Sequence, residues 1–345
     1  MSRQRKRILV VRLDRIGDVL LSTPVIKNLR DAYPKSYIAF MVRPYAREIT
    51  QGNPYLDDVI VYDKENEESG LAANFEFIKY LRRKKFDTAV ILHPTTRTNL
   101  LIFLTGIRER IGYDRKWGFL LTHRIPHTKQ EGLKHEIDYT LDVLKHMGLT
   151  PQSRQMHMPI NSVSEMKVGK ALEAAGICDD DLLIAINPSA SCPSKRWPAV
   201  KFAKVADTLK NKYNAKIVII GAKGDLAFGD AVHRSMGGES LDLSGKTTVS
   251  ELASVLKRAK LFISNDSGPV HIACALGTPV VAIFGRSDQG LSPKRWGPSG
   301  KRDIVLHKNA GCVVCLAHNC VKDFLCLDAI TVEDVVSAAA KILGK

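Results

Sequence analysis

The sequence predicts an α/β protein with two doubly wound parallel-sheet domains in tandem. Short apolar runs alternate with helical segments, which is the rhythm of a parallel sheet covered by helices. The alternation restarts after a polar, proline-bearing segment at 147–162, the expected linker. A length of 345 residues also suits two domains better than one. We therefore expect the two domains to face each other across a cleft walled by the carboxyl ends of both sheets.

The individual elements follow from the apolar runs in order. In the first half, strands are expected at 7–13, 37–42, 58–62 and 87–92, with helices at 25–32 and 71–84. In the second half, strands are expected at 182–187, 215–221, 260–264 and 279–285, with helices at 198–213, 248–258 and 269–276. A closing helix is expected at 331–343. The domain boundaries are thus 1–160, 161–330 and 331–345.

Basic residues outnumber acidic ones in both halves of the chain. Lys and Arg number 51 against 36 Asp and Glu, a formal charge of +15. Residues 1–150 hold 26 basic and 18 acidic residues, and 151–345 hold 25 and 18. This spread favours an anionic substrate or surface over a single nucleic-acid-binding tail. The sequence contains neither a secretory h-region nor a membrane-spanning run, and we expect a cytoplasmic protein with Cys178, Cys192 and Cys274 reduced.

The stretch RIGDVLLSTP at 15–24 places a carboxylate, Asp18, directly after the first strand. Two interpretations remain open, a helix N-cap and a catalytic group at the end of a strand. Pro24 leaves the helix start open as well: either Thr23 caps a helix beginning at Pro24, or a helix beginning near Asp18 is kinked there. The glycine-rich fingerprint of nicotinamide dinucleotide enzymes is missing, which argues against an oxidoreductase.

Two loops of the second half suit a phosphate-bearing ligand. In NPSASCPSKRWP, residues 187–198, the adjacent cations Lys195 and Arg196 follow the hydroxyls of Ser189 and Ser191. Both cations can donate charge-assisted hydrogen bonds to phosphate, although a solvated Lys-Arg pair is the alternative. In the loop 222–225, Asp225 could accept from a ribose hydroxyl.

The stretch 263–285 contains the clearest candidate anion site. Asp266, Ser267 and Gly268 form a tight turn after a strand, and Pro269 is expected at the first helical position. The free N–H groups and the dipole of such a helix start favour an anion. His271 lies in the first turn, where it could touch a diphosphate or simply pack in the core.

Four cysteines cluster near the carboxyl terminus. Cys312, Cys315, Cys320 and Cys326 have a C-x2-C-x4-C-x5-C spacing. Four thiolates within fifteen residues can bind zinc tetrahedrally, although the second pair is unusually separated. Structural zinc, an iron–sulfur cluster and reduced thiols all remain open. Asp179, Asp180 and Asp181 precede a strand and are interpreted as a solvated turn.

Three motifs together resemble the ADP-heptose lipopolysaccharide heptosyltransferases of glycosyltransferase family 9. They are RIGDVLLSTP, NPSASCPSKRWP and NDSGPVHIACALGTPVVAIFG, which occur in this order over nearly the whole chain. The resemblance implies GT-B architecture, with two Rossmann-like domains, the second holding the nucleotide sugar and the first facing the acceptor. SKRWP at 194–198 resembles the heptosyltransferase II branch.

The resemblance also implies roles for individual residues. Asp18 matches the family's proposed catalytic base, and Lys195 matches its phosphate-contacting lysine. Asp266, together with Ser267 and Gly268, matches its nucleotide-sugar site. The implied reaction is an inverting transfer of heptose from ADP-heptose to the lipopolysaccharide inner core, without a cofactor. A helix N-terminus near Asp18 would favour its ionised form and weaken it as a base.

The implied partners and location follow from the same resemblance. An anionic membrane surface is expected as a further partner, so the protein would lie in the cytoplasm or peripherally on the inner face of the inner membrane. The alternatives are a related transferase with another nucleotide sugar or acceptor, and a basic zinc-bearing nucleic-acid-binding protein. Few aromatic residues and evenly spread charge argue against nucleic acid.

Overall fold

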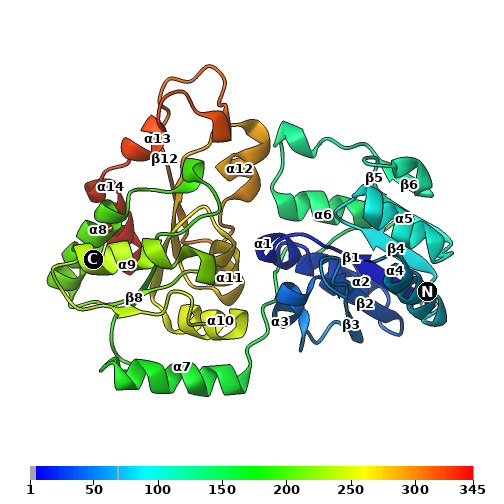
Figure 1. Cartoon of the computed structure of the whole chain (residues 1–345), viewed down its shortest axis with the longest axis horizontal. Coiled ribbons are helices and arrows are strands. Elements are labelled where there is room, and N and C mark those ends of the chain that lie inside the picture. The colour runs from blue at the N-terminus through cyan, green and yellow to red at the C-terminus, as the bar shows by residue number, and fades with distance from the viewer. Residues whose placement is uncertain (1–4, 68–69, 345) are drawn as a thin grey trace. The chain divides into compact units, whose positions relative to one another are not determined.

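The computed structural model describes residues 5–67 and 70–344, which form two compact units. Unit 1 comprises residues 1–130 and 134–159, and unit 2 comprises residues 131–133 and 160–345. Each unit contains one six-stranded parallel sheet with helices on both faces (Figure 1). No helix within the described residues combines the length and apolar character needed to cross a bilayer.

The sheet of unit 1 has the order β3-β2-β1-β4-β5-β6. Its strands are β1 (Arg7–Val11), β2 (Tyr37–Val42), β3 (Asp58–Val61), β4 (Thr88–Ile91), β5 (Glu109–Tyr113) and β6 (His123–Ile125). Its helices are α1 (Ile16–Leu20), α2 (Thr23–Ala32), α3 (Arg47–Thr50), α4 (Leu71–Arg83), α5 (Thr96–Leu104) and α6 (Glu136–Lys145). Helices α4 and α5 cover one face, where they pack on Leu9, Val11 and Ile91.

The sheet of unit 2 has the equivalent order, β12-β11-β10-β7-β8-β9. Its strands are β7 (Leu183–Asn187), β8 (Lys216–Ile219), β9 (Leu241–Asp242), β10 (Leu261–Asn265), β11 (Val280–Phe284) and β12 (Ile304–His307). Its helices are α7 (Ser162–Ala174), α8 (Ala199–Tyr213), α9 (Leu226–Ser235), α10 (Val249–Arg258), α11 (Gly268–Leu276), α12 (Pro293–Trp296), α13 (Leu325–Asp328) and α14 (Val332–Leu343). Helices α8 and α14 share one buried core with the strands.

The strand order places a switch point at the centre of each sheet. All strands are parallel, but the order in which successive strands are added to the sheet reverses between β1 and β4 in unit 1 and between β7 and β10 in unit 2, and open α/β sheets bind ligands at such points. The loops that follow these four strands are therefore the ones that can hold a site.

The eight expected strands are all present, and the structure adds β5, β6, β9 and β12. β5 and β6 carry charged residues and β9 has only two residues, so these three lack the continuous apolar run of a central parallel strand. β12 has the sequence IVLH and is partly exposed along its length. The closing helix, α14, packs into the core of unit 2 and is not a separate body.

Candidate active site

A buried arginine after β1 gathers three carboxylates in unit 1. Arg12 is 2% exposed, and its Nε donates to Asp14 at 2.7 Å, its Nη2 to Asp18 at 2.7 Å and its Nη1 to Glu136 at 3.2 Å. Lys129 Nζ donates to the same Glu136 oxygen at 2.8 Å. The side chains of these five residues, here called the Arg12 network, combine three carboxylates with two cations.

Asp18 does not cap a helix, so that interpretation is wrong. Helix α1 begins at Ile16 with Arg15 as its N-cap, and Asp18 is its third residue. The Asp18 carboxylate accepts from Arg12 instead. The first of the two expected helix starts is correct to within one residue: α1 ends at Leu20, and a separate helix, α2, begins at Thr23 with Ser22 as its N-cap and Pro24 in its first turn.

The surroundings of Asp18 favour a base. Burial raises the pKa of Asp18 to about 6, the nearby charge of Asp14 adds to this effect, and Arg12 opposes it. The helix start would by itself weaken Asp18 as a base, but burial has the largest effect on its pKa and raises it. A carboxylate with a pKa near neutrality combines a populated ionised form with useful proton affinity.

His93, which follows β4, joins the Arg12 network to a neighbouring pocket. Its Nδ1 lies 3.6 Å from Asp14 Oδ2. Burial, together with the charge of Arg12, lowers the pKa of His93 to about 4, so the imidazole is neutral at pH 7. A neutral ring can accept or donate a hydrogen bond to a sugar hydroxyl without adding charge.

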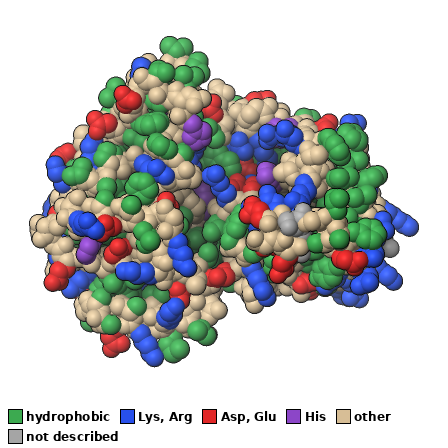
Figure 2. Space-filling model, in the orientation of Figure 1, with side chains coloured by type: hydrophobic (Ala, Val, Ile, Leu, Met, Phe, Trp, Pro, Cys, Tyr) green, Lys and Arg blue, Asp and Glu red, His purple; other side chains and the backbone are tan. Residues whose placement is uncertain are grey.

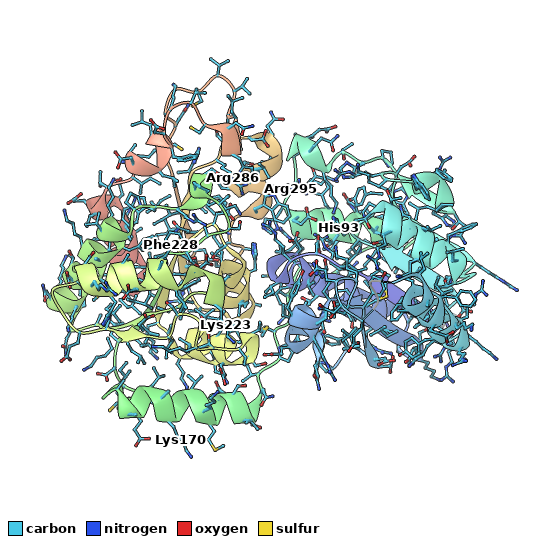
Figure 3. All side chains as sticks on the ribbon, in the orientation of Figure 1. His93, Lys170, Lys223, Phe228, Arg286 and Arg295 are labelled. Atoms are coloured by element: carbon cyan, nitrogen blue, oxygen red, sulfur yellow. The ribbon has the colours of Figure 1, made fainter. Side chains whose placement is uncertain are left out.

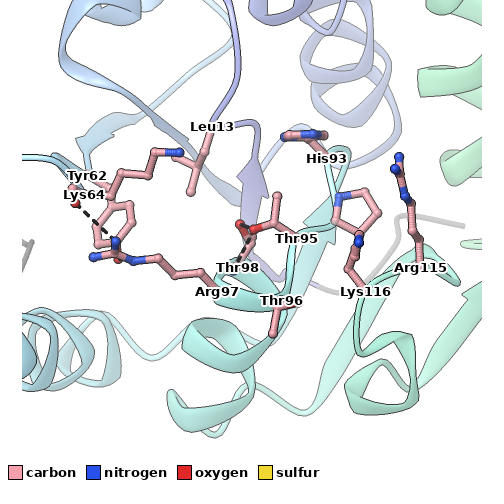
Figure 4. A pocket seen from close by; sticks show the side chains of 11 residues that line it. Leu13, Tyr62, Lys64, His93, Thr95, Thr96, Arg97, Thr98, Arg115 and Lys116 are labelled. Carbon is pink, nitrogen blue, oxygen red and sulfur yellow. Dashed lines mark hydrogen bonds between the residues drawn. The ribbon is translucent and has the colours of Figure 1, made fainter.

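The pocket beside His93 is lined by cations. Its volume is about 420 Å³, and its lining includes Lys64, Arg97, Arg115 and Lys116, with no acidic side chain among the described lining residues (Figure 4). Hydroxyls of the first turn of α5 also line it, and Thr95 caps that helix. The pocket therefore suits an anionic, hydroxyl-rich ligand.

In unit 2, one carboxylate holds two cations together. Asp266 Oδ2 lies 3.0 Å from Lys195 Nζ and accepts a hydrogen bond from Arg286 Nη2 at 2.7 Å. The side chains of Lys195, Asp266 and Arg286 are 13%, 7% and 6% exposed. The Arg286 Nε–H finds no acceptor among the described residues. This triad carries an excess of one positive charge in a buried place, which favours an anionic ligand.

Tight packing positions the triad. Gly285, just before Arg286, sits where a Cβ would lie 2.8 Å from the Ser194 carbonyl oxygen and 2.6 Å from Leu327 Cγ. Asn265 accepts from the Trp197 backbone N–H at 3.0 Å and donates to the Pro188 carbonyl at 2.7 Å. These contacts join the loops after β7, β10 and β11 and fix where both cations lie.

The predicted residues of unit 2 lie on these loops but differ in their contacts. Ser189 is buried and donates to Asn187, which in turn donates to Ser267 at 2.9 Å. Ser267 is the N-cap of α11, and Gly268 is the first helical residue. Pro269 is therefore the second residue of the helix, whereas the sequence predicted it at the first position. His271 is buried within the first turn of α11.

The remaining three predicted residues contribute differently. Arg196 donates to the Ala190 carbonyl at 2.8 Å and stacks on Phe228 at 4.4 Å, so it is not a solvated cation. Asp225 ends a short 3-10 turn before α9 and is partly exposed, as Ser191 is exposed on its loop. Figure 3 labels Phe228 and Arg286 in unit 2 and His93 in unit 1.

The cysteine cluster gives no support for zinc. Cys312, Cys315, Cys320 and Cys326 line one pocket as free thiols. Among the described residues, no three His, Cys, Asp or Glu side chains are arranged to hold a metal ion. The segment instead contacts the turn that carries Arg286, since Cys326 Sγ donates to the Gly285 carbonyl.

Sequence reasoning missed the partners that tune both clusters. Arg12 and Asp14 follow β1, and His93 follows β4. Their positions after strand ends were the signal that could have identified them as site residues. Glu136 opens α6 and Arg286 follows β11, but no local pattern joins either of them to its partners.

Comparison with known proteins places this fold in a family. The profile of "Glycosyltransferase family 9 (heptosyltransferase)" matches residues 74–325. Lipopolysaccharide heptosyltransferase 3 of Escherichia coli is 28% identical over 337 residues, covering 95% of this chain and 96% of the relative. Lipopolysaccharide heptosyltransferase 2 of Escherichia coli strain K12 is 23% identical over 296 residues, covering 83% and 85%.

A solved structure agrees over the full length. The crystal structure of a family 9 glycosyl transferase from Veillonella parvula has a TM-score of 0.87 and 28% identity, covering 100% of this chain and 99% of that one. The predicted α/β class and the two Rossmann-like domains of GT-B architecture are confirmed. The chain belongs to glycosyltransferase family 9, the heptosyltransferase family.

Proposed function

We propose that the protein is an inverting glycosyltransferase that moves heptose from ADP-heptose to the inner core of lipopolysaccharide. The observation that carries the proposal is the chemistry of the two clusters: a carboxylate of raised pKa in unit 1 and a buried cation pair with excess positive charge in unit 2. Glycosyl transfer from a nucleotide sugar needs both a base and a stabiliser of the leaving phosphate. The names of the relatives support heptose and lipopolysaccharide as substrates.

Asp18 acts as the base in this proposal. It accepts the proton of the acceptor hydroxyl while the hydroxyl oxygen bonds to the anomeric carbon and the bond from that carbon to the phosphate oxygen breaks. Arg12, held on three carboxylates, keeps the Asp18 oxygen in one position. Inversion at the anomeric carbon follows from a single displacement.

Unit 2 binds the donor in this proposal. Lys195 and Arg286 stabilise the negative charge of the departing ADP, and the N–H groups at the start of α11, from Ser267 and Gly268, bind a phosphate. Asp266 orients the two cations within the nucleotide-sugar site that the resemblance implies. Ser189, Ser191, Arg196, Asp225 and His271 complete the donor site as supporting residues.

Unit 1 binds the acceptor in this proposal. The pocket with Lys64, Arg97, Arg115 and Lys116 lies beside His93, which contacts the Arg12 network. Phosphorylated groups of an inner core match its positive charge. We place the acceptor domain at 1–160 and the donor domain at 161–330, and we propose transfer without a cofactor by a cytoplasmic enzyme.

The direct test is product analysis by mass spectrometry. The purified protein is incubated with ADP-heptose and a series of truncated lipopolysaccharide acceptors. Addition of one heptose to one acceptor supports the proposal and identifies whether a first, second or later heptose is added. Transfer from another nucleotide sugar, with none from ADP-heptose, would instead support the related transferase. Binding of nucleic acid is not favoured, because the chain belongs to a family of glycosyltransferases.

A further inference from the structure

An exposed apolar surface lies on unit 1, over α5 and the short 3-10 turn Gly118–Leu120. Hydrophobic side chains gather over α5 in Figure 2. The outward-facing members are Leu100, Phe103, Leu104, Trp117 and Phe119, which are 37%, 44%, 40%, 48% and 68% exposed. We call these five side chains the α5 surface. Exposed aromatic residues gathered in this way mark a contact site with another phase or molecule.

Helix α5 is apolar on more sides than packing requires. Leu101 and Ile102 already fill the core of unit 1, yet Leu100, Phe103 and Leu104 continue the apolar run on the outer side. A helix on the surface of a water-soluble protein normally presents polar residues there. The outer face of α5 is therefore built for an apolar neighbour.

The turn after β5 holds aromatic side chains outward at a conformational cost. Lys116 and Trp117 both have left-handed backbone conformations, with φ of 48° and 61°. Such conformations are unfavourable for bulky residues and persist only when the surroundings enforce them. Asn99, a buried residue of α5, donates to the carbonyl oxygens of Arg115 and Lys116 at 3.2 and 2.8 Å and holds the turn in place. Trp117 then lies 6.1 Å from Phe119, ring centre to ring centre.

Cations of the surrounding segment contact the α5 surface. Residues 79–124 contain eleven Lys and Arg against three Asp and Glu, so more than half of the net charge of the whole chain comes from this segment. Arg82 donates to the Leu104 carbonyl at 2.8 Å, and the Arg110 guanidinium lies 5.4 Å from the Phe103 ring centre. The even spread of charge between the two halves conceals this concentration within unit 1.

We propose that the α5 surface docks unit 1 onto an anionic lipid bilayer. Aromatic and aliphatic side chains enter the headgroup region while the surrounding cations pair with lipid phosphates, the combination typical of interfacial binding. Arg115 and Lys116 belong both to the surroundings of this surface and to the lining of the cationic pocket. Docking would therefore bring the pocket to the sugars of a lipid-anchored acceptor, and in this sense the inference rests on the proposed function.

Vesicle binding tests the proposal without donor or acceptor, so its outcome is independent of transfer activity. The full-length protein is sedimented with vesicles of phosphatidylcholine alone or with about one-third phosphatidylglycerol. We expect binding to the anionic vesicles, loss with added salt, and a blue shift of tryptophan emission that Trp117→Phe abolishes. The Phe103→Ser/Phe119→Ser variant should bind about tenfold more weakly.

The matched control is Val163→Ser/Met166→Ser, which removes two exposed apolar side chains from α7 in unit 2. It should bind vesicles like the unchanged protein, and thermal melting verifies that all variants are folded. Equal binding of Phe103→Ser/Phe119→Ser and the unchanged protein would overturn the proposal. Concentration-dependent self-association that this variant abolishes, with no vesicle binding, would overturn it in favour of an interface between two copies.

Discussion

The guanidinium of Arg12 and the carboxylate of Asp18 lie 2.7 Å apart, six residues from each other along the chain, at the end of the central strand of unit 1. Arg12 is surrounded by carboxylates, which raise its pKa against the opposing effect of burial. It therefore stays charged and fixes the direction of the Asp18 oxygen, while desolvation and Asp14 keep that carboxylate basic. The opposing effects of one cation and several buried acids set the proton affinity of the candidate base.

Replacing Asp18 by Asn should slow transfer strongly and preserve the donor site. The amide cannot accept the acceptor proton, so kcat should fall by about 10² to 10⁴. The affinity for ADP, measured by calorimetry, should change less than about twofold, because the triad of unit 2 is untouched. Asp31→Asn, which removes an exposed carboxylate paired with Lys27 on α2, is the control. Near-normal turnover of Asp18→Asn would exclude Asp18 as the base.

The pH dependence of kcat/KM should report the raised pKa of Asp18. Activity requires the ionised carboxylate, so the rate should rise with pH through about 6 and level off above it. Replacing Glu136 by Gln removes a negative charge that raises the pKa of Asp18. The acidic limb of the profile, the pH range over which kcat/KM rises, should therefore move to lower pH in Glu136→Gln.

If Glu136 has only a structural role, a different result is expected for Glu136→Gln. It would lower activity or stability at every pH and leave the limb where it is. Glu76→Gln, on the exposed side of α4, should not move the limb. A limb that stays fixed or moves to higher pH in Glu136→Gln would contradict the assigned coupling.

Arg286→Gln should weaken ADP binding more than AMP binding. The change removes the excess charge of the triad and a donor whose Nε–H finds no acceptor among the described residues. Loss of a charge-assisted hydrogen bond of about 1.5–3 kcal/mol corresponds to about a 10- to 150-fold higher Kd for ADP. If Arg286 has only a structural role, its replacement should weaken the binding of ADP and AMP equally. The ratio of the Kd for ADP to the Kd for AMP therefore distinguishes phosphate binding from a structural role. Arg234→Gln, an exposed arginine on α9, is the matched control.

Lys116→Gln should raise the KM for the acceptor and leave kcat and ADP binding nearly unchanged. Lys116 lines the cationic pocket but belongs to neither charged cluster, so it contributes to ground-state binding. Loss of one partly exposed charge contact predicts about a three- to tenfold increase at low salt, and less at high salt. Lys145→Gln, on α6 of the same unit, should leave the acceptor KM as it is. An unchanged acceptor KM in Lys116→Gln would remove the pocket from acceptor binding.

The central strands and most helices could be predicted because their signals are local. A strand buried on both faces needs an apolar side chain at nearly every position, so β1, β2, β7 and β11 are visible as continuous runs. The helix after β10 could be placed to within one residue from its glycine and proline. Candidates such as Asp18, Lys195 and Asp266 were found because strand ends are where such sheets bind ligands.

The tertiary structure alone decided what those candidates contact. Arg12 meets Glu136 from 124 positions away, and Asp266 meets both Lys195 and Arg286 on loops after other strands. The pKa of a carboxylate depends on desolvation and on charges brought near by folding, and neither quantity is written in its neighbours along the chain. The sequence by itself thus determined two parallel sheets and the loops that hold the candidates. Packing decided that Asp18 is mostly buried with a raised pKa and that Arg286 joins Lys195 on Asp266. Packing also decided that the outer face of α5 remains exposed, because burial and Coulomb interactions act through space between segments far apart in the chain.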